Sequence, residues 1–101
     1  MIDLIKAIAK RLKEQYGAKE VILFGSYARG NPRIDSDIDL LIISDSKERF
    51  FERQATVRRL LRDLKKRIPV SPIVLTPDEI EERKKHEDQF INEILKTGIR
   101  A

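Results

Sequence analysis

Hydrophobic residues in the first quarter of the chain predict a helix followed by a strand. Apolar side chains recur at helical spacing at Ile5, Ile8, Ala9, Leu12 and Tyr16. Gly17 follows the last of them, as is typical of a helix C-terminus. The short apolar run 21–24 then ends at Gly25, which indicates a strand that is buried on both faces.

A second strand is predicted over residues 37–43. Its even positions are uniformly apolar, whereas its odd positions begin with Asp37 and Asp39 and become apolar at Leu41 and Ile43. Because alternate residues of a strand share a face, this pattern predicts a face that is wet at the start and dry at the end. Between the two strands, residues 26–29 can form a short helix, and 31–36 form a polar loop.

The middle of the chain predicts a long helix, with Asp45 or Ser46 as its cap. Its expected buried stripe consists of Phe50, Val57, Leu61, Leu64 and Ile68. Its other side is basic, with Arg49, Arg53, Arg58, Arg59, Arg62 and Lys65. Acidic residues are interspersed among these, which favours a solvated face over a nucleic-acid-binding surface. Binding to DNA or RNA that weakens steeply with salt would instead indicate a nucleic-acid-binding surface.

The last third predicts one strand and two helices. Residues 70–75 form the third strand, and Pro72 favours an edge position for it. Thr76, Pro77 and Glu79 supply a cap, a first helical residue and a capping box. The final helix carries Phe90, Ile91, Ile94 and Leu95 and stops at Gly98. Three strands with helices between them predict an α/β (α+β) layer structure, and 101 residues predict a single domain, 1–101.

Composition narrows the class of ligand and the compartment. The formal net charge is +4, which suits a phosphate-bearing ligand or an acidic partner without establishing a nucleic-acid binder. Cysteine is absent, so thiol catalysis is excluded and a reducing cytosol is favoured. Neither a signal peptide nor an apolar stretch of membrane-spanning length is visible, and we expect a cytoplasmic protein without a membrane partner.

Asp37 and Asp39 are the first candidate site. Two residues apart on a strand, their Cα atoms lie roughly 6.6 Å apart on one face, so both carboxylates can bind one Mg²⁺. A solvated strand end is the more common explanation of an isolated pair. Gly25 and Ser26 are the second candidate, because glycine allows close backbone approach and Ser26 opens a short helix that can bind phosphate.

The two candidates together are more specific than either alone. They predict an anion site beside a cation site, as a metal–triphosphate complex requires. Other phosphate motifs are missing: Asn31-Pro32 stands where a P-loop has Lys and Ser or Thr, and no G-x-G-x-x-G occurs. The single histidine, His86, lies in a charged helix and is expected to be solvated. Arg29 and Arg33 flank the loop, and each can bind a phosphate or an acceptor, with a solvated charge as the alternative.

The segments 25–30 (Gly-Ser-Tyr-Ala-Arg-Gly) and 35–40 (Asp-Ser-Asp-Ile-Asp-Leu) resemble the signature of the DNA polymerase β-like nucleotidyltransferases. The whole chain resembles their minimal prokaryotic members, including the ending 90–98. The resemblance implies a short mixed sheet with helices packed on one side. It also implies that Gly25 and Ser26 hold the triphosphate, with Arg29 beside it, and that Asp37 and Asp39 are catalytic and bind Mg²⁺.

The same resemblance implies the reaction and the partner. Such proteins transfer AMP from ATP to an acceptor hydroxyl, and minimal members act as antitoxins of small helical HEPN-type proteins. One position departs from the pattern, because Ser71 stands where a third carboxylate is expected, and serine is a poor base. Asp78 and Glu79 are explained by the helix cap, while Asp35 and Asp63 are unsupported substitutes. Two hypotheses remain: an adenylylating enzyme, and an antitoxin that neutralises its partner by contact alone.

Overall fold

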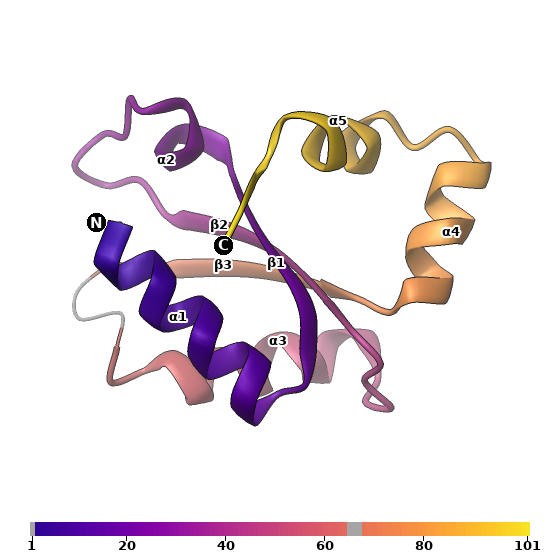
Figure 1. Ribbon diagram of the computed structural model, residues 1–101, viewed down its shortest axis with the longest axis horizontal. Coiled ribbons are helices and arrows are strands. Elements are labelled where there is room, and N and C mark those ends of the chain that lie inside the picture. The colour runs from indigo at the N-terminus through magenta and orange to yellow at the C-terminus, as the bar shows by residue number, and fades with distance from the viewer. Residues whose placement is uncertain (1, 65–67) are drawn as a thin grey trace.

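A computed structural model describes residues 2–64 and 68–101 and shows a mixed sheet between helices (Figure 1). Within these residues the strand order is β3-β2-β1-β4; β2 runs antiparallel to β1 and parallel to β3. The elements are α1 (Ile2–Gln15), β1 (Ala18–Phe24), α2 (Gly25–Arg29), β2 (Ile38–Ser44), α3 (Phe50–Leu61), β3 (Val70–Leu75), α4 (Pro77–Lys85), α5 (Gln89–Thr97) and β4 (Ile99–Arg100).

The prediction of three strands is wrong by one short edge strand. β4 follows Gly98 and pairs antiparallel with β1, with Arg100 opposite Ile22 and Ile99 opposite Leu23. Two residues are too few for an alternating pattern, so the hydrophobic periodicity could not reveal this strand. The α/β class and the position of β3 at the other edge, expected from Pro72, are confirmed.

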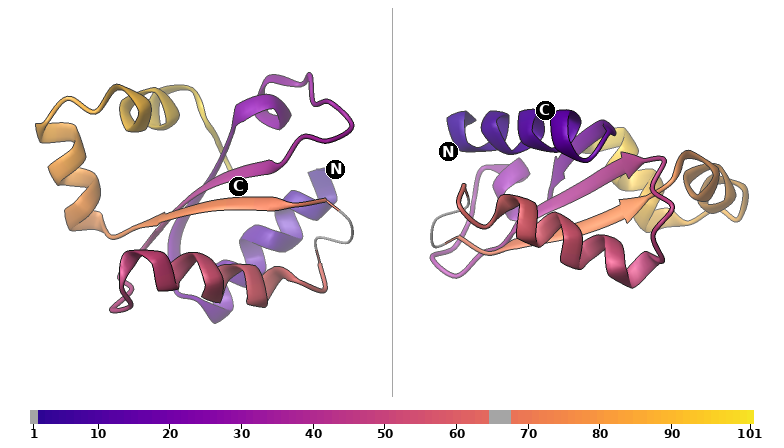
Figure 2. Two further views of the ribbon diagram at one scale, coloured as in Figure 1. Left: turned by 180° about the vertical axis from the view of Figure 1, so that it is seen from behind. Right: turned by 90° about the horizontal axis from the view of Figure 1, so that it is seen from below.

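Helices cover both faces of the sheet, so the expectation of helices on one side only is wrong. On one face Leu40 and Ile42 pack with α1 and α3. On the other face Leu41 and Ile43 pack with α4 and α5. Figure 2 shows the sheet between these two sets of helices. Burial on both faces explains why β1 and β2 are apolar at consecutive positions instead of alternating.

Helix α3 is shorter than predicted, and its cap differs. Arg49 occupies the N-cap position, and its backbone N–H donates to the Glu52 side chain over 3.2 Å. Neither Asp45 nor Ser46 caps the helix; the Ser46 hydroxyl instead accepts a hydrogen bond from the Glu48 N–H. The corrections to the expected stripe are that Phe50 is exposed and that both Leu64 and Ile68 lie beyond the end of the helix. Lys65 lies outside the described residues.

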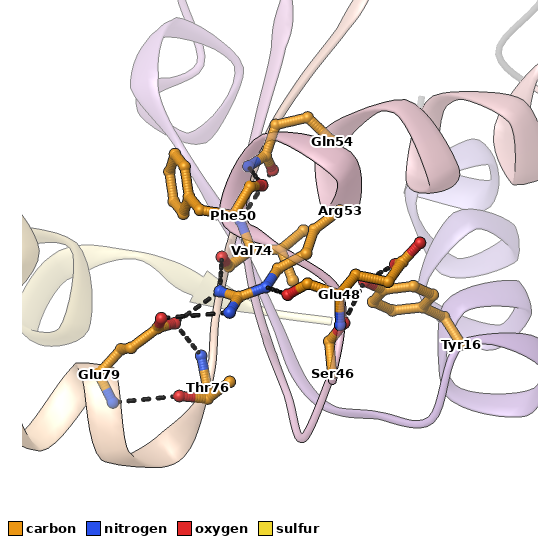
Figure 3. A network of polar contacts seen from close by, with 9 residues as sticks. All are labelled: Tyr16, Ser46, Glu48, Phe50, Arg53, Gln54, Val74, Thr76 and Glu79. Carbon is orange, nitrogen blue, oxygen red and sulfur yellow. Dashed lines mark hydrogen bonds and ion pairs between the residues drawn. The ribbon is translucent and has the colours of Figure 1, made fainter.

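Arg53 was predicted on the solvated face, and this is also wrong. It is only 6% exposed and joins α3 to β3 and α4 (Figure 3). Its guanidinium donates to the Glu79 carboxylate at 2.6 Å, to the Val74 carbonyl at 3.1 Å and to the Glu48 carbonyl at 3.0 Å. The basic surface that a nucleic acid would need therefore has one cation fewer than the sequence suggested.

The outer edge of β3 is covered by side chains of α3. The Val74 N–H donates to the Gln54 side chain at 3.1 Å, and the Val74 carbonyl accepts from Arg53. Pro72 has no N–H to offer. The following helix begins as predicted: the Thr76 hydroxyl accepts from the Glu79 N–H, and the Glu79 carboxylate accepts from the Thr76 N–H. Glu79 thus caps α4 and binds Arg53 at the same time.

Candidate nucleotide and metal site

Asp39 and Gly25 lie against each other where β1 ends and β2 begins. Asp39 is paired across the ladder with Phe24, the residue before Gly25. A Cβ added to Gly25 would overlap the Oδ2 atom of Asp39 and lie 3.1 Å from its Cγ. Gly25 also has a φ of 77°, which side-chain-bearing residues rarely adopt. Only glycine therefore allows the turn after β1 to approach this carboxylate so closely.

Asp37 lies one residue before β2 instead of within it. The strand begins at Ile38, whose N–H donates to the Pro69 carbonyl at 2.8 Å, and Asp37 is exposed in front of it. Asp39 is half-buried, whereas Leu41 and Ile43 further along the same face are buried. The predicted change from a wet to a dry face is confirmed.

The environment raises the pKa of the Asp39 carboxyl above its ordinary value. Burial is the largest cause, repulsion from the nearby Asp37 carboxylate adds to it, and Arg29 partly offsets both. Asp37 and Asp39 are thus close enough to interact, as two ligands of one cation must be. A bound divalent cation would remove the repulsion and lower the cost of ionising Asp39.

Ser26 and Arg29 lie on α2, directly after Gly25. Among the described residues, no side chain caps the start of α2, so its first N–H groups remain available to an anion. Gly30 ends the helix in the left-handed conformation, and its N–H bonds back to carbonyls of the helix. Arg29 is exposed on the same short helix, while Arg33 lies in the following loop, where its backbone N–H donates to Ser36.

Ser71 lies directly beside Asp39 on the neighbouring parallel strand. The position where the family resemblance puts a third acid therefore belongs to the same face and the same end of the sheet. The substitutes considered from sequence do not fill it. Asp63 forms an ion pair with Arg11 at 2.9 Å, and Glu79 is engaged with Arg53 and the α4 cap. Asp35 is exposed in the loop before β2.

Two carboxylates form the whole acidic part of this site. Across the residues that the structure describes, no group of three or more potential metal-binding side chains occurs. His86 is exposed and pairs with Glu82 at 2.8 Å, as the expectation of a solvated histidine requires. Asp37 and Asp39 fit a hard divalent ion: their ligands are oxygen atoms, their mutual repulsion is not fully neutralised, and substrate phosphates can supply further oxygen ligands.

A pocket of about 470 Å³ adjoins the Gly25 turn and was missed by sequence reasoning. α2 contributes Gly25 and Arg29 to its lining, and α5 contributes Phe90 and Glu93. The sequence carried no signal for it, because Phe90 continues the helical spacing of Ile91 and Ile94. The structure shows that Phe90 is 54% exposed although its neighbour Ile91 is buried, and an exposed large aromatic side chain can mark a binding surface.

Within residues 2–64 and 68–101, every helix is too short or too polar to span a membrane.

With the turn, the carboxylates and the sheet in place, comparison with known proteins defines the class. A family model described as nucleotidyltransferase domain matches residues 5–99. The chain therefore belongs to the nucleotidyltransferase domain family, a class of transferases that generally use a nucleoside triphosphate and a divalent metal. The sequence prediction of this family is confirmed.

Individual relatives share the class. The chain is 33% identical over 102 residues to "Putative protein adenylyltransferase MJ0141" of Methanocaldococcus jannaschii, covering 98% of this chain and 96% of the relative. It is 44% identical over 40 residues to "Protein adenylyltransferase MntA" of Thermococcus cleftensis, where the match spans 40% of each chain. It is 51% identical over 43 residues to "Putative protein adenylyltransferase MJ0604" of M. jannaschii, where the match covers 41% of this chain and 43% of the relative.

Proposed function

We propose that this chain transfers AMP from ATP, with Mg²⁺, to a hydroxyl group of a small helical HEPN-type protein, and thereby acts as its antitoxin. The observation that carries the proposal is the contact between Gly25 and Asp39, which leaves no room for a Cβ at position 25. It brings the turn to which we assign phosphate binding against Asp39, the more buried carboxylate of the proposed metal pair. The relatives are named protein adenylyltransferases, which supports the choice of reaction.

Each site residue has a role in this proposal. The N–H groups at the start of α2 and the Ser26 hydroxyl bind phosphate oxygens, and Arg29 offsets their charge. Asp37 and Asp39 hold the metal. When bound, Mg²⁺ would neutralise charge on the phosphates and hold them for an in-line displacement. The acceptor oxygen forms a bond to the α-phosphorus, the bond from that phosphorus to the bridging oxygen breaks, pyrophosphate leaves, and the hydroxyl proton passes to solvent.

The test is transfer of label from ATP to the partner. The chain is incubated with Mg²⁺, a small helical HEPN-type protein from the same organism, and ATP labelled at either the α- or the γ-phosphorus. We expect label on the partner from α-labelled ATP only, and none when Asp37→Ala and Asp39→Ala are combined. The exposed neighbouring acid provides a matched control, so Asp35→Ala should transfer normally. Absence of transfer by the unaltered chain, or transfer of the γ-label, would refute the proposal.

A second candidate is an antitoxin that acts by contact alone. The observation that favours it is Ser71 beside Asp39, because serine cannot accept the acceptor's proton as a carboxylate does. Under this alternative, the double variant Asp37→Ala with Asp39→Ala still neutralises the partner in a growth assay. Under the enzymatic proposal, the same variant fails to neutralise it although it still binds.

A further inference from the structure

The pocket between α2 and α5 is larger than a phosphate turn alone requires. At about 470 Å³ it falls within the range of small-molecule sites, roughly 300–1,000 Å³. Its α2 wall carries Gly25 and Arg29, which the proposed function already assigns to phosphate binding. Its α5 wall carries Phe90, Glu93 and Thr97, which have no role in the transfer as described above. A ligand whose phosphates lie against α2 therefore extends toward α5.

Phe90 supplies an aromatic surface at this pocket. Its ring makes an edge-to-face contact with Phe24, with centroids 5.7 Å apart and planes at 84°. Phe24 also lines the pocket, at the end of β1. The contact with Phe24 orients the Phe90 ring, yet 54% of the residue stays exposed. An oriented and accessible aromatic ring is the kind of group on which nucleic-acid bases stack.

The polar groups of the α5 wall are hydrogen-bond acceptors. The Thr97 hydroxyl donates its proton to the Glu93 backbone carbonyl at 2.8 Å, so its remaining capacity is to accept. The Glu93 carboxylate also accepts only, once ionised. The complementary ligand must therefore present donors at this end, as the exocyclic amine of a purine does.

The geometry points to a base-binding subsite. The pocket receives the purine ring of the nucleoside triphosphate, stacked on Phe90, with the exocyclic amine donating to Glu93 and the phosphates against Gly25 and Arg29. This inference rests on the proposed function, because it takes the triphosphate at the Gly25–Ser26 turn as given. It adds the part of the substrate that the phosphate and metal residues do not recognise.

The first test separates base binding from phosphate binding. Calorimetry measures the affinity of the full chain, with Mg²⁺, for a non-hydrolysable ATP analogue and for inorganic tripolyphosphate, which has neither base nor ribose. Phe90→Ala is expected to weaken analogue binding about tenfold, the scale of one lost base stack, and to leave tripolyphosphate unaffected. Phe90→Leu, which keeps apolar packing on Phe24, should lose nearly as much. Phe51→Ala is the matched control, because Phe51 is 69% exposed on α3.

The second test addresses the exocyclic amine. The unaltered chain should bind ATP about tenfold more tightly than purine riboside triphosphate, which lacks the 6-amino group. Glu93→Ala should remove this difference by weakening only the amine-bearing nucleotide. Glu93→Gln, which keeps an acceptor oxygen, should preserve part of it.

The outcomes distinguish this inference from the function beneath it. If the analogue binds and Phe90→Ala binds it equally well, or if UTP binds as tightly as ATP, the base subsite is refuted while the proposed transfer stands. If the unaltered chain binds neither the analogue nor tripolyphosphate, the proposed function is refuted and the subsite with it.

Discussion

At the scale of single residues, the most demanding position is Gly25. Gly25 and Gly30 have nearly the same φ, 77° and 78°, but a Cβ would collide with Asp39 only at Gly25, whereas it would meet nothing within 4 Å at Gly30. Comparing the two glycines therefore separates the free-energy cost of the unusual φ angle from the cost of steric overlap with Asp39. Each alone would look like an ordinary turn glycine.

We expect Gly25→Ala to abolish nucleotide transfer and to destabilise the fold by about 2–3 kcal/mol, from backbone strain plus displacement of the Asp39 side chain. Gly30→Ala pays the strain alone, about 1 kcal/mol, and should keep most of the activity. Denaturant unfolding and the label-transfer assay measure both. Equal effects of the two substitutions would show that the approach to Asp39 is unimportant.

Asp39 predicts a pH dependence with a definite sign. Because its folded pKa is raised, the metal-free protein loses stability as the pH rises through that pKa, whereas below the unfolded pKa no penalty exists. Asp39→Asn should therefore stabilise the metal-free protein by about 0.5–1 kcal/mol at neutral pH and have no effect in acid. Unfolding curves at several pH values measure the difference; a constant difference across them would contradict the assignment. Activity should be lost at every pH.

At the scale of elements, the register between β2 and β3 determines where a third acidic residue would lie relative to Asp39. Ser71 lies beside Asp39 in the parallel ladder. Ser71→Asp is expected to raise the rate of transfer at saturating Mg²⁺ by about a hundredfold, the lower end of the usual contribution of a general base. It should also weaken metal-free stability, because it adds a third like charge. Single-turnover rates test this, and an unchanged rate would mean that the acceptor hydroxyl needs no base from this chain.

The Arg53–Glu79 ion pair, with 2.6 Å between its atoms, connects α3 to α4. Arg53→Met leaves the Val74 carbonyl without this donor and the Glu79 carboxylate with the Thr76 N–H but no positive partner, and we expect a loss of about 2–4 kcal/mol of folding stability. The pair lowers the pKa of Glu79, so its stabilising effect is present near neutral pH and is lost as the pH falls through that pKa. Arg58→Met, exposed on the same helix, is the control and should change stability by less than about 0.5 kcal/mol. Unfolding at pH 7 and in acid measures both.

The sequence could predict most elements because their apolar periodicity and end signals agree. Gly17, Thr76, Pro77 and Gly98 mark helix ends where the structure has them. The sequence could not predict that Arg53 is buried. Its burial depends on the ion pair with Glu79, which lies on another helix and was predicted only as part of the capping box of that helix. β4 was too short for its pattern to be recognised.

The sequence could predict one part of the candidate site but not the other. The placement of Asp39 beside Gly25 followed from two local motifs joined by a loop. The pocket between α2 and α5 could not be predicted from the sequence, because these two helices are distant along the chain. No local pattern records which helices meet across the end of a strand.

At the scale of the whole molecule, ligand binding should stabilise the fold as a unit, because the site residues come from α2, from β2 and from the loop that joins them. A Mg²⁺–ATP concentration about 100 times the Kd adds about 2.7 kcal/mol, which for a domain of this size raises the Tm by roughly 10 °C. The double variant Asp37→Ala with Asp39→Ala should show no such rise. Thermal unfolding with ATP alone, Mg²⁺ alone and both together measures it. Equal shifts with and without metal would argue against a metal–triphosphate complex.

The covered outer edge of β3 has a consequence for the aggregation of this protein at high concentration. Exposed sheet margins are templates on which further chains polymerise, and proteins protect them in several ways. Here proline supplies one protection, and a glutamine and an arginine from α3 supply the others. These features oppose intermolecular sheet growth, the first step toward fibrils, on this flank; within the described residues the opposite flank, beyond the two-residue β4, is the other place where it could start.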